Sequence, residues 1–303
     1  IRPRKALSLT LGLMAGLSFG VGLAFFQEYM DNTIKSPDDV SRYLHLPMIA
    51  AIPKREALRG KASYGQYSIL QADSALDLIS FNAPNSVLSE AYRSMRTSLL
   101  LSSADHPPKT VMVTSAVPSE GKTTTAINLA ISLTQTGARV VLLDAAMRKP
   151  RINSVFALGA TPGLSAVLTG SVGLKEVLYD VSVPNLFVIP CGVIPPNPAE
   201  MVMSKRFQQM LTSLREYFDY VVIDSPPVSN VTDARILGRL TDATLVVVKA
   251  LSTPREVAAH AVGSLVNSHA HVSGVVLNDV DMRIKGYDSY YAGYSGQYYA
   301  AKS

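Results

Sequence analysis

From residue 110 onward, short apolar runs alternate along the chain with stretches of helical character. Runs such as VVLL, YVVI and LVVV are apolar on both faces, which is typical of parallel strands that helices cover on each side. This alternation implies right-handed crossovers and an α/β fold with a doubly wound, mostly parallel sheet. The predicted strands are 48–52, 110–114, 139–143, 186–189, 220–223, 243–248 and 272–277, and the predicted helices are 85–102, 122–135, 205–217, 234–239 and 254–267.

The beginning of the chain has a different pattern. The stretch ALSLTLGLMAGLSFGVGLAFF, from Ala6 to Phe26, contains no charged residue and no proline. As a helix it would be about 31 Å long at about 1.5 Å per residue, which is enough to cross a bilayer. We therefore expect one transmembrane helix over residues 1–27; a buried core helix and the apolar core of a signal peptide are the alternatives.

We expect residues 28–84 to form a juxtamembrane linker with a short helix and a strand, because residues 54–84 are polar and show no sustained period. Within this linker, the segment SPDD at 36–39 predicts an N-cap, a proline at the first helical position and acids in the first turn of a short helix. Residues 85–283 are expected to form the main domain, and residues 284–303 a flexible tail.

Composition narrows the classes of protein that need to be considered. A chain of 303 residues can bury a sizeable core, and 48% of its residues are hydrophobic. Cys191 is the only cysteine, which leaves no internal disulfide and no thiol metal cluster, and His269 and His271 lack further ligands in the sequence around them. The net charge is +5, and no basic run is interleaved with aromatic residues, so we expect no nucleic-acid partner.

The strongest local signal is TSAVPSEGKTTT, which follows a predicted strand and opens a predicted helix. Its GKT core is that of a P-loop, in which backbone N–H groups at a helix N-terminus hold phosphate oxygens. The lysine of such a loop reaches the outer phosphates, and the threonine hydroxyl binds Mg²⁺. The loop therefore implies bound nucleotide phosphates and Mg²⁺. The candidate cofactor-binding residues are Ser119, Glu120, Gly121, Lys122, Thr123 and Thr124.

Two other predicted strands end in an aspartate: VVLLD ends at Asp144, and YVVID ends at Asp224. In a parallel sheet the carboxyl ends of the strands lie at one edge, so both aspartates and the P-loop should converge. A carboxylate there can order Mg²⁺ or accept a proton from an incoming hydroxyl, whereas a helix N-cap is the alternative for each aspartate alone. The candidate catalytic residues are Lys122, Asp144 and Asp224, and the candidate metal ligands are Thr123, Asp144 and Asp224.

Together these three motifs resemble the Walker A, Walker A′ and Walker B motifs of bacterial tyrosine kinases, the BY-kinases, which are similar to MinD/ParA-like P-loop NTPases. Upstream, NTIKSPDDVSRYLHLP at 32–47 resembles the stretch that follows the second membrane helix of Wzc-like polysaccharide co-polymerases. SEAYRSMR at 89–96 resembles the family's ExxRxxR helix, and the C-terminal tyrosine cluster resembles its phosphoacceptor tail. The resemblance covers almost the whole chain.

The resemblance implies an ATP-dependent protein-tyrosine kinase that phosphorylates its own tail between subunits and regulates capsule or exopolysaccharide polymerisation and export. It also implies a bacterial inner-membrane location with a cytoplasmic kinase domain, a homo-oligomeric ring, and partners in the polysaccharide export machinery and a phosphotyrosine phosphatase. Glu90, Arg93 and Arg96 would make the subunit contacts, and Asn278 stands where this class of ATPase often contacts adenine.

The tail itself supports the kinase interpretation, because six of the 14 tyrosines lie between Tyr287 and Ser303. The residues between these tyrosines supply little apolar bulk, so we expect the segment to be mobile and within reach of a neighbouring subunit. A low-complexity end without function is the alternative. The implied phosphoacceptors are Tyr287, Tyr290, Tyr291, Tyr294, Tyr298 and Tyr299.

The sequence departs from the family pattern at three positions. Ala116 replaces the first glycine of GxxxxGK[ST], and Val117 stands where MinD/ParA proteins carry a signature lysine. Ala146 stands where the A′ motif usually has its second aspartate, which should weaken metal handling or proton transfer and leave the phosphate cradle intact. We interpret Ala146 as an inactivating replacement, natural or introduced. A nucleotide-binding scaffold without catalysis and a MinD/ParA-like ATPase are the alternatives.

Overall fold

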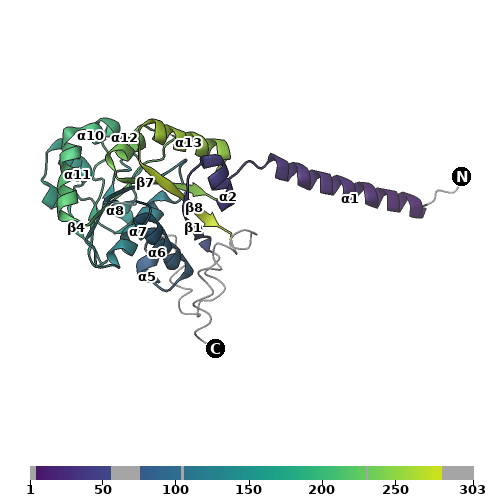
Figure 1. Ribbon diagram of the computed structural model, residues 1–303, viewed down its shortest axis with the longest axis horizontal. Coiled ribbons are helices and arrows are strands. Elements are labelled where there is room, and N and C mark those ends of the chain that lie inside the picture. The colour runs from purple at the N-terminus through teal and green to yellow at the C-terminus, as the bar shows by residue number, and fades with distance from the viewer. Residues whose placement is uncertain (1–4, 56–75, 104–105, 230, 282–303) are drawn as a thin grey trace, which may run out of the picture. The chain divides into compact units, whose positions relative to one another are not determined.

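The computed structural model describes residues 5–55, 76–103, 106–229 and 231–281. The chain divides into two compact units, Ile1–Thr33 and Ile34–Ser303. The first unit contains one helix, α1 (Lys5–Met30), so the helix expected at the start of the chain is present (Figure 1). Among the residues described, we find no helix with both the length and the apolar character that crossing a membrane requires, and the predicted span is therefore not confirmed.

The second unit is built around an eight-stranded sheet with the order β1-β8-β7-β2-β6-β3-β5-β4. All neighbouring strands are parallel except β4, which runs antiparallel to β5. The mostly parallel α/β sheet predicted from the apolar runs is therefore confirmed. The strands are β1 (Met48–Pro53), β2 (Thr110–Ser115), β3 (Val140–Asp144), β4 (Tyr179–Asp180), β5 (Leu186–Ile189), β6 (Tyr220–Asp224), β7 (Ala243–Lys249) and β8 (Val272–Val280).

Helices cover both faces of this sheet (Figure 1). One face carries α5 (Ile79–Asn82), α6 (Val87–Leu100) and α7 (Lys122–Thr134), whose buried side chains share one core cluster. The other face carries α11 (Lys205–Tyr217), α12 (Asp233–Leu240) and α13 (Arg255–Asn267). The shorter helical segments are α2 (Pro37–Asp39), η1 (Val40–Leu44), α8 (Ile152–Val155), α9 (Leu164–Thr169), η4 (Leu174–Val177) and α10 (Pro198–Met203).

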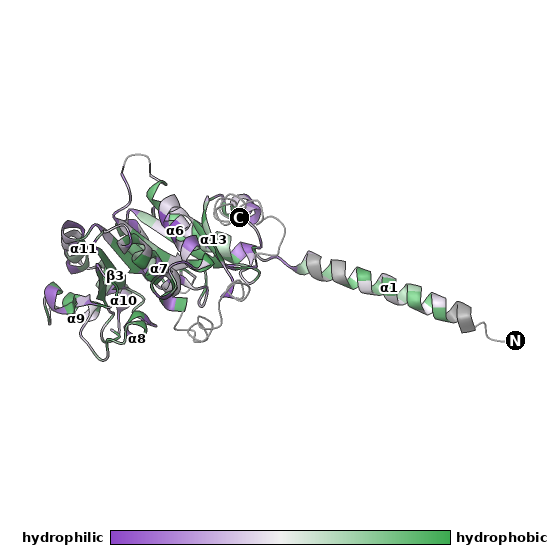
Figure 2. Cartoon of the chain, turned by 90° about the horizontal axis from the view of Figure 1, so that it is seen from below, coloured by the Kyte–Doolittle hydropathy of each residue, from purple (hydrophilic) through white to green (hydrophobic). Residues whose placement is uncertain are grey.

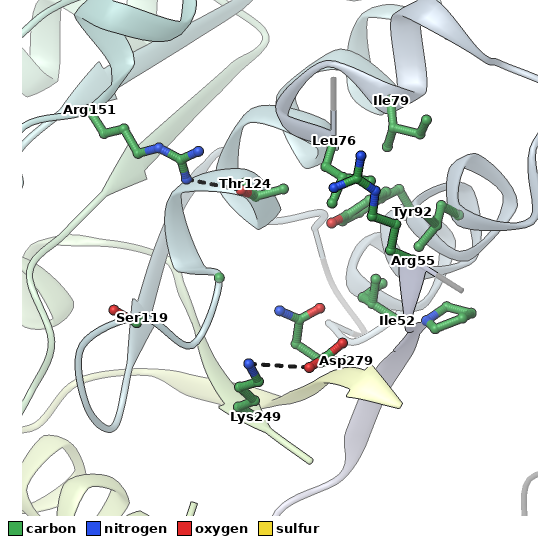
Figure 3. Close-up of a pocket in the computed structure, with 14 residues that line it drawn as sticks. Ile52, Arg55, Leu76, Ile79, Tyr92, Ser119, Thr124, Arg151, Lys249 and Asp279 are labelled. Carbon is green, nitrogen blue, oxygen red and sulfur yellow. Dashed lines mark hydrogen bonds and ion pairs between the residues drawn. The ribbon is translucent and has the colours of Figure 1, made fainter. Parts of the chain in front are cut away.

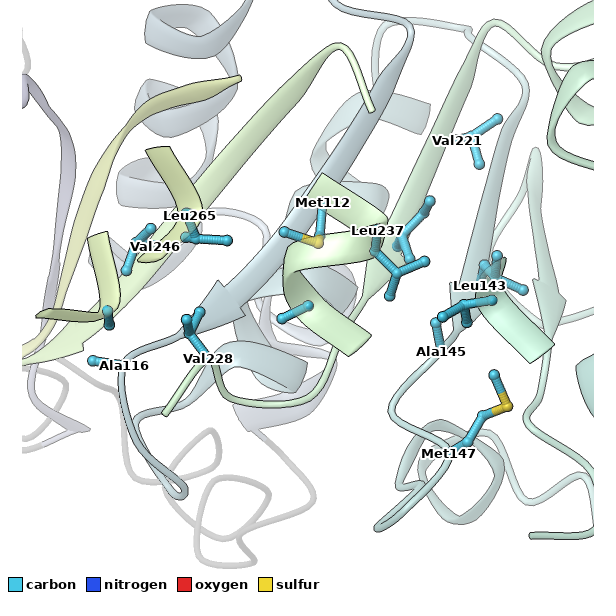
Figure 4. Close-up of a cluster of buried hydrophobic side chains, with 14 of the residues drawn as sticks. Met112, Ala116, Leu143, Ala145, Met147, Val221, Val228, Leu237, Val246 and Leu265 are labelled. Atoms are coloured by element: carbon cyan, nitrogen blue, oxygen red, sulfur yellow. The ribbon is translucent and has the colours of Figure 1, made fainter. Parts of the chain in front are cut away.

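Successive side chains of each central strand enter opposite cores. In β2, Met112 packs in the cluster that contains Leu237 and Leu265, which Figure 4 shows, whereas Val111 and Val113 belong to the cluster under α6 and α7. Figure 2 shows strands of mainly hydrophobic residues among helices that carry both hydrophobic and hydrophilic residues. Two covered faces are the physical reason for the unbroken apolar runs, because neither face of these strands meets water.

The structure adds detail in the region expected to be a linker. β1, which agrees with the strand predicted at 48–52, pairs in parallel with β8, with Met48 opposite Val275, and is an edge strand of the sheet. The SPDD segment begins α2 as predicted: the Ser36 hydroxyl accepts a hydrogen bond from the Asp39 N–H, and the Asp39 carboxylate accepts one from the Ser36 N–H. Residues 56–75 and the tail 282–303, with all six predicted phosphoacceptor tyrosines, lie outside the described residues.

One prediction tests the placement of α11. Phe207 is fully buried in the core, and Phe207→Ala is expected to lower the free energy of unfolding by about 3–5 kcal/mol, because it leaves a cavity. Tyr217, at the other end of the same helix, has 62% of its surface exposed, so Tyr217→Ala should change stability by only about 0.5 kcal/mol. Urea unfolding measures both variants, and equal losses would contradict the orientation of α11.

Candidate nucleotide-binding site

The loop between β2 and α7 has the backbone geometry of a phosphate cradle. Ser119 and Gly121 both have left-handed backbone conformations, with φ of 67° and 94°. A Cβ atom on residue 121 would lie 2.2 Å from Nδ2 of Asn278, and that amide donates a hydrogen bond of 2.8 Å to the Glu120 carbonyl oxygen. Glycine is therefore required at 121 by both its φ angle and the close approach of Asn278.

The Glu120 side chain is buried, and it holds the loop in place through hydrogen bonds. One carboxylate oxygen accepts the Val117 N–H at 2.7 Å, and the other accepts the Lys249 N–H at 3.3 Å and the Thr253 hydroxyl. Burial raises the pKa of Glu120, and the Thr253 hydrogen bond opposes that shift. Glu120, predicted as a cofactor-binding residue, therefore has only its backbone available for a phosphate.

At the N-terminus of α7, three side chains form one hydrogen-bonded group. The Lys122 ammonium lies 3.2 Å from Oδ1 of Asp224 and donates to the Thr123 hydroxyl at 3.0 Å. The Thr123 hydroxyl in turn donates to Oδ2 of Asp224 at 2.7 Å. The predicted lysine, threonine and aspartate therefore come together, and the Asp224 carboxylate is completely buried among them.

Asp144 lies directly opposite Asp224 in the register of β3 and β6, and it is also completely buried. Its carboxylate accepts backbone N–H groups from Ala146 at 3.1 Å, Arg151 at 3.2 Å and Ile152 at 3.1 Å. Burial raises the pKa of Asp144 to about 7, and the nearby negative charge of Asp224 adds to that shift. The two aspartates therefore converge at one sheet edge, as the sequence predicts.

A pocket of about 430 Å³ opens beside the P-loop (Figure 3). Its polar part is lined by Ser119, Gly121 and Thr124, and its apolar part by side chains of β1, α5 and α6, including Ile52 and Tyr92. Asn278, predicted to contact adenine, lines the same pocket. The loop requires glycine at residue 121, and the pocket beside it has a polar part and an apolar part. This combination suits a nucleotide, which has polar phosphates and an apolar base.

The donor set also suits Mg²⁺. The Thr123 hydroxyl and the Asp144 and Asp224 carboxylates are hard oxygen ligands, which Mg²⁺ prefers together with water and phosphate oxygens. The phosphate cradle and the candidate metal ligands meet at the N-terminus of α7, whose partial positive charge favours anions. The individual roles of these residues remain predictions.

The charged residues of the ExxRxxR motif on α6, Glu90, Arg93 and Arg96, form contacts within the chain. Arg93 forms an ion pair with Glu90 and donates to the Pro84 carbonyl oxygen at 2.6 Å. Arg96 donates to the Ser132 carbonyl oxygen at 2.6 Å and so fastens α6 to α7. The motif therefore contains an internal Glu–Arg ion pair. The contact of these residues with another subunit remains a prediction.

Two residues were not predicted from the sequence: Arg151, which lines the pocket, and its buried partner Asp77. The hydroxyl of Thr124 donates to Oδ1 of Asp77 at 2.5 Å, and Nη2 of Arg151 donates to Oδ2 of Asp77 at 2.6 Å. No motif marks Asp77, which lies in the region expected to be a linker. Only its place shortly after Asp144 could have pointed to Arg151.

The chain is similar to proteins of a known family. A family model described as an AAA domain matches residues 109–279. Tyrosine-protein kinase YwqD of Bacillus subtilis is 38% identical over 202 residues, which cover 67% of this chain and 85% of that protein. Tyrosine-protein kinase wzc of Salmonella typhimurium is 31% identical over 291 residues, which cover 96% of this chain and 40% of that protein. The chain therefore spans about two fifths of the length of wzc.

A solved structure extends the similarity to the fold. The kinase domain of the Escherichia coli tyrosine kinase ETK matches with a TM-score of 0.74 and 27% sequence identity, over 83% of this chain and 97% of that one. The region that the family model matches includes the P-loop and both strands that end in the buried aspartates. The chain belongs to the bacterial tyrosine kinase family.

Proposed function

We propose that the chain is an ATP-dependent protein-tyrosine kinase whose acceptors are tyrosines in the tail of a second copy. One observation carries the proposal: Lys122, Thr123 and Asp224 form a single hydrogen-bonded group at the N-terminus of α7, with Asp144 beside it. The names of the relatives support kinase chemistry over other uses of a P-loop.

In this mechanism the chain's own residues would bind the nucleotide and the metal and would accept one proton from the tyrosine hydroxyl. Mg-ATP, when bound, supplies the phosphoryl group and the positive charge of the metal. Lys122 would neutralise charge on the outer phosphates, and Thr123 and Asp224 would hold the metal. Asp144 accepts the proton of the attacking tyrosine hydroxyl, for which a pKa of about 7 is well matched to neutral pH.

The wider setting of the kinase belongs to the same proposal. The subunits form a homo-oligomeric ring, the tail of one subunit reaches its neighbour, and phosphates near −2 charge loosen the ring by repulsion. Export of a capsule or exopolysaccharide and reversal by a phosphotyrosine phosphatase are supported by the resemblance of residues 32–47 and of the tail. Attachment to the inner membrane through residues 1–27, with the kinase domain in the cytoplasm, is supported only by the uncharged run in the sequence.

A second candidate function is a nucleotide-binding scaffold that does not transfer phosphate. The observation that favours it is Ala146, a buried methyl group where the family's A′ motif usually carries a carboxylate. A MinD/ParA-like ATPase is the third candidate, and ATP turnover without phosphotyrosine would distinguish it.

The central test compares the chain with its Ala146→Asp variant. After incubation with Mg-ATP, intact-mass spectrometry is expected to show a ladder of added phosphates that is much stronger in Ala146→Asp, because a second carboxylate restores metal handling and proton transfer. Adding Lys122→Met to that variant should reduce the rate of phosphorylation by about 10²-fold or more, because it removes charge stabilisation at the phosphates. Absence of phosphate in both chains, with nucleotide bound, would support the scaffold.

Asp144 gives a prediction about pH. Its pKa is about 7 in the folded chain and about 3.9 when unfolded, so the folded state holds this proton more tightly. The stability that this group contributes is present below about pH 4 and is lost as the pH rises through 7, with a slope of up to about 1.4 kcal/mol per pH unit. Urea unfolding between pH 5 and 8 without nucleotide should therefore show a loss of stability that Asp144→Asn removes.

The matched control for that experiment is Asp180→Asn, because Asp180 is an exposed carboxylate. This variant should keep the pH dependence of the parent chain. A constant difference in unfolding free energy between the parent and Asp144→Asn across this pH range would contradict the raised pKa.

A further inference from the structure

An ion pair that the mechanism above does not use borders the pocket beside the P-loop. Asp77 lies just before α5 and is 1% exposed, and its carboxylate is 2.6 Å from Nη2 of Arg151. The Arg151 side chain is 46% exposed and lines the pocket. A buried carboxylate thus lies behind a cation that faces the cavity.

Arg151 contacts both Asp144 at the end of β3 and Thr124 in the first turn of α7. Its backbone N–H donates to Oδ2 of Asp144 at 3.2 Å, and its guanidinium lies 3.4 Å from the Thr124 hydroxyl (Figure 3). That hydroxyl donates to Asp77, so Asp77, Thr124 and Arg151 form a closed triangle beside the P-loop. Asn128 fixes the triangle further, because its amide donates to the carbonyl oxygens of Asp77 and Thr124.

The charges in this triangle matter because of where they lie. Thr124 is in the first turn of α7, where the partial positive charge of the helix attracts anions. The Asp77 carboxylate lies at that same helix end. Its negative charge opposes the binding of phosphates there. The Arg151 guanidinium offsets this negative charge at close range, and interactions between partly buried charges are screened by salt less than those in water.

We propose that Arg151 is a positioning residue of the nucleotide site, whose guanidinium neutralises Asp77 and so prevents that carboxylate from repelling the nucleotide phosphates. This inference rests on the proposed binding of nucleotide at the P-loop. Asp77 in turn holds Arg151 and Thr124 in place. The pair therefore sets the affinity of the pocket for phosphates, while the proton and metal chemistry stays with Asp144 and Asp224.

The test measures the Kd of the chain for a fluorescent ADP analogue with Mg²⁺, in Arg151→Gln, Asp77→Asn and the double variant. Arg151→Gln is expected to raise Kd by about tenfold, because the carboxylate then acts without its guanidinium partner. The double variant should return to within about threefold of the parent, because it removes the repelling charge as well.

The chain offers a matched control in a second ion pair of the same kind. Arg148 is 45% exposed and lies 3.1 Å from Asp233, which is 1% exposed, and neither residue lines the pocket. Arg148→Gln should lower the thermal unfolding temperature about as much as Arg151→Gln, and it should leave Kd within about threefold of the parent. The comparison separates an electrostatic effect on phosphates from a general loss of stability.

Each outcome decides the inference. A selective rise in Kd for Arg151→Gln that the Asp77→Asn replacement reverses would support it. An unchanged Kd in Arg151→Gln, a double variant as weak as the single one, or an equal rise in Arg148→Gln would overturn it while the proposed function stands. If the parent chain does not bind the ADP analogue, both the proposed function and this inference fail.

Discussion

The repulsion between two buried carboxylates is the constraint around which the site is arranged. Asp144 and Asp224 face each other at the ends of adjacent strands, and both are completely removed from water. Burying a second like charge is costly unless a cation, hydrogen bonds or a proton compensates it. Here Lys122 supplies the cation, backbone N–H groups supply hydrogen bonds to Asp144, and the pKa of Asp144 rises to about 7.

The doubly wound sheet makes this arrangement possible. Parallel strands place all their carboxyl ends at one edge, and helices on both faces exclude water from the strands that carry the aspartates. The same cover gives α7 its position, with its N-terminus directed at Asp224 through Thr123. The helices that cover both faces of the sheet explain the apolar runs in the sequence. By excluding water, the same helices also raise the pKa of Asp144.

Features that periodicity and strand direction determine are predicted well from the sequence, and features that depend on tertiary contacts are predicted poorly. The convergence of Lys122 with Asp224 results from a P-loop and a strand end, and the bounds of 186–189 and 205–217 agree with β5 and α11. The membership of β1 in the sheet is set by its pairing with β8, which local pattern does not encode. The inward turn of Glu120 toward Thr253, far away in the sequence, could not be predicted for the same reason.

Ala146 shows which contacts of the site do not depend on a side-chain carboxylate at this position. Its N–H still donates to Asp144, so the turn after β3 holds its shape without a side-chain carboxylate. The contacts that shape the phosphate cradle, from Glu120 to Asn278, do not involve residue 146. One negative charge fewer near Asp144 and Asp224 leaves a weaker attraction for a divalent cation. The backbone contacts of the P-loop and of the turn after β3 are therefore independent of a side-chain carboxylate at residue 146.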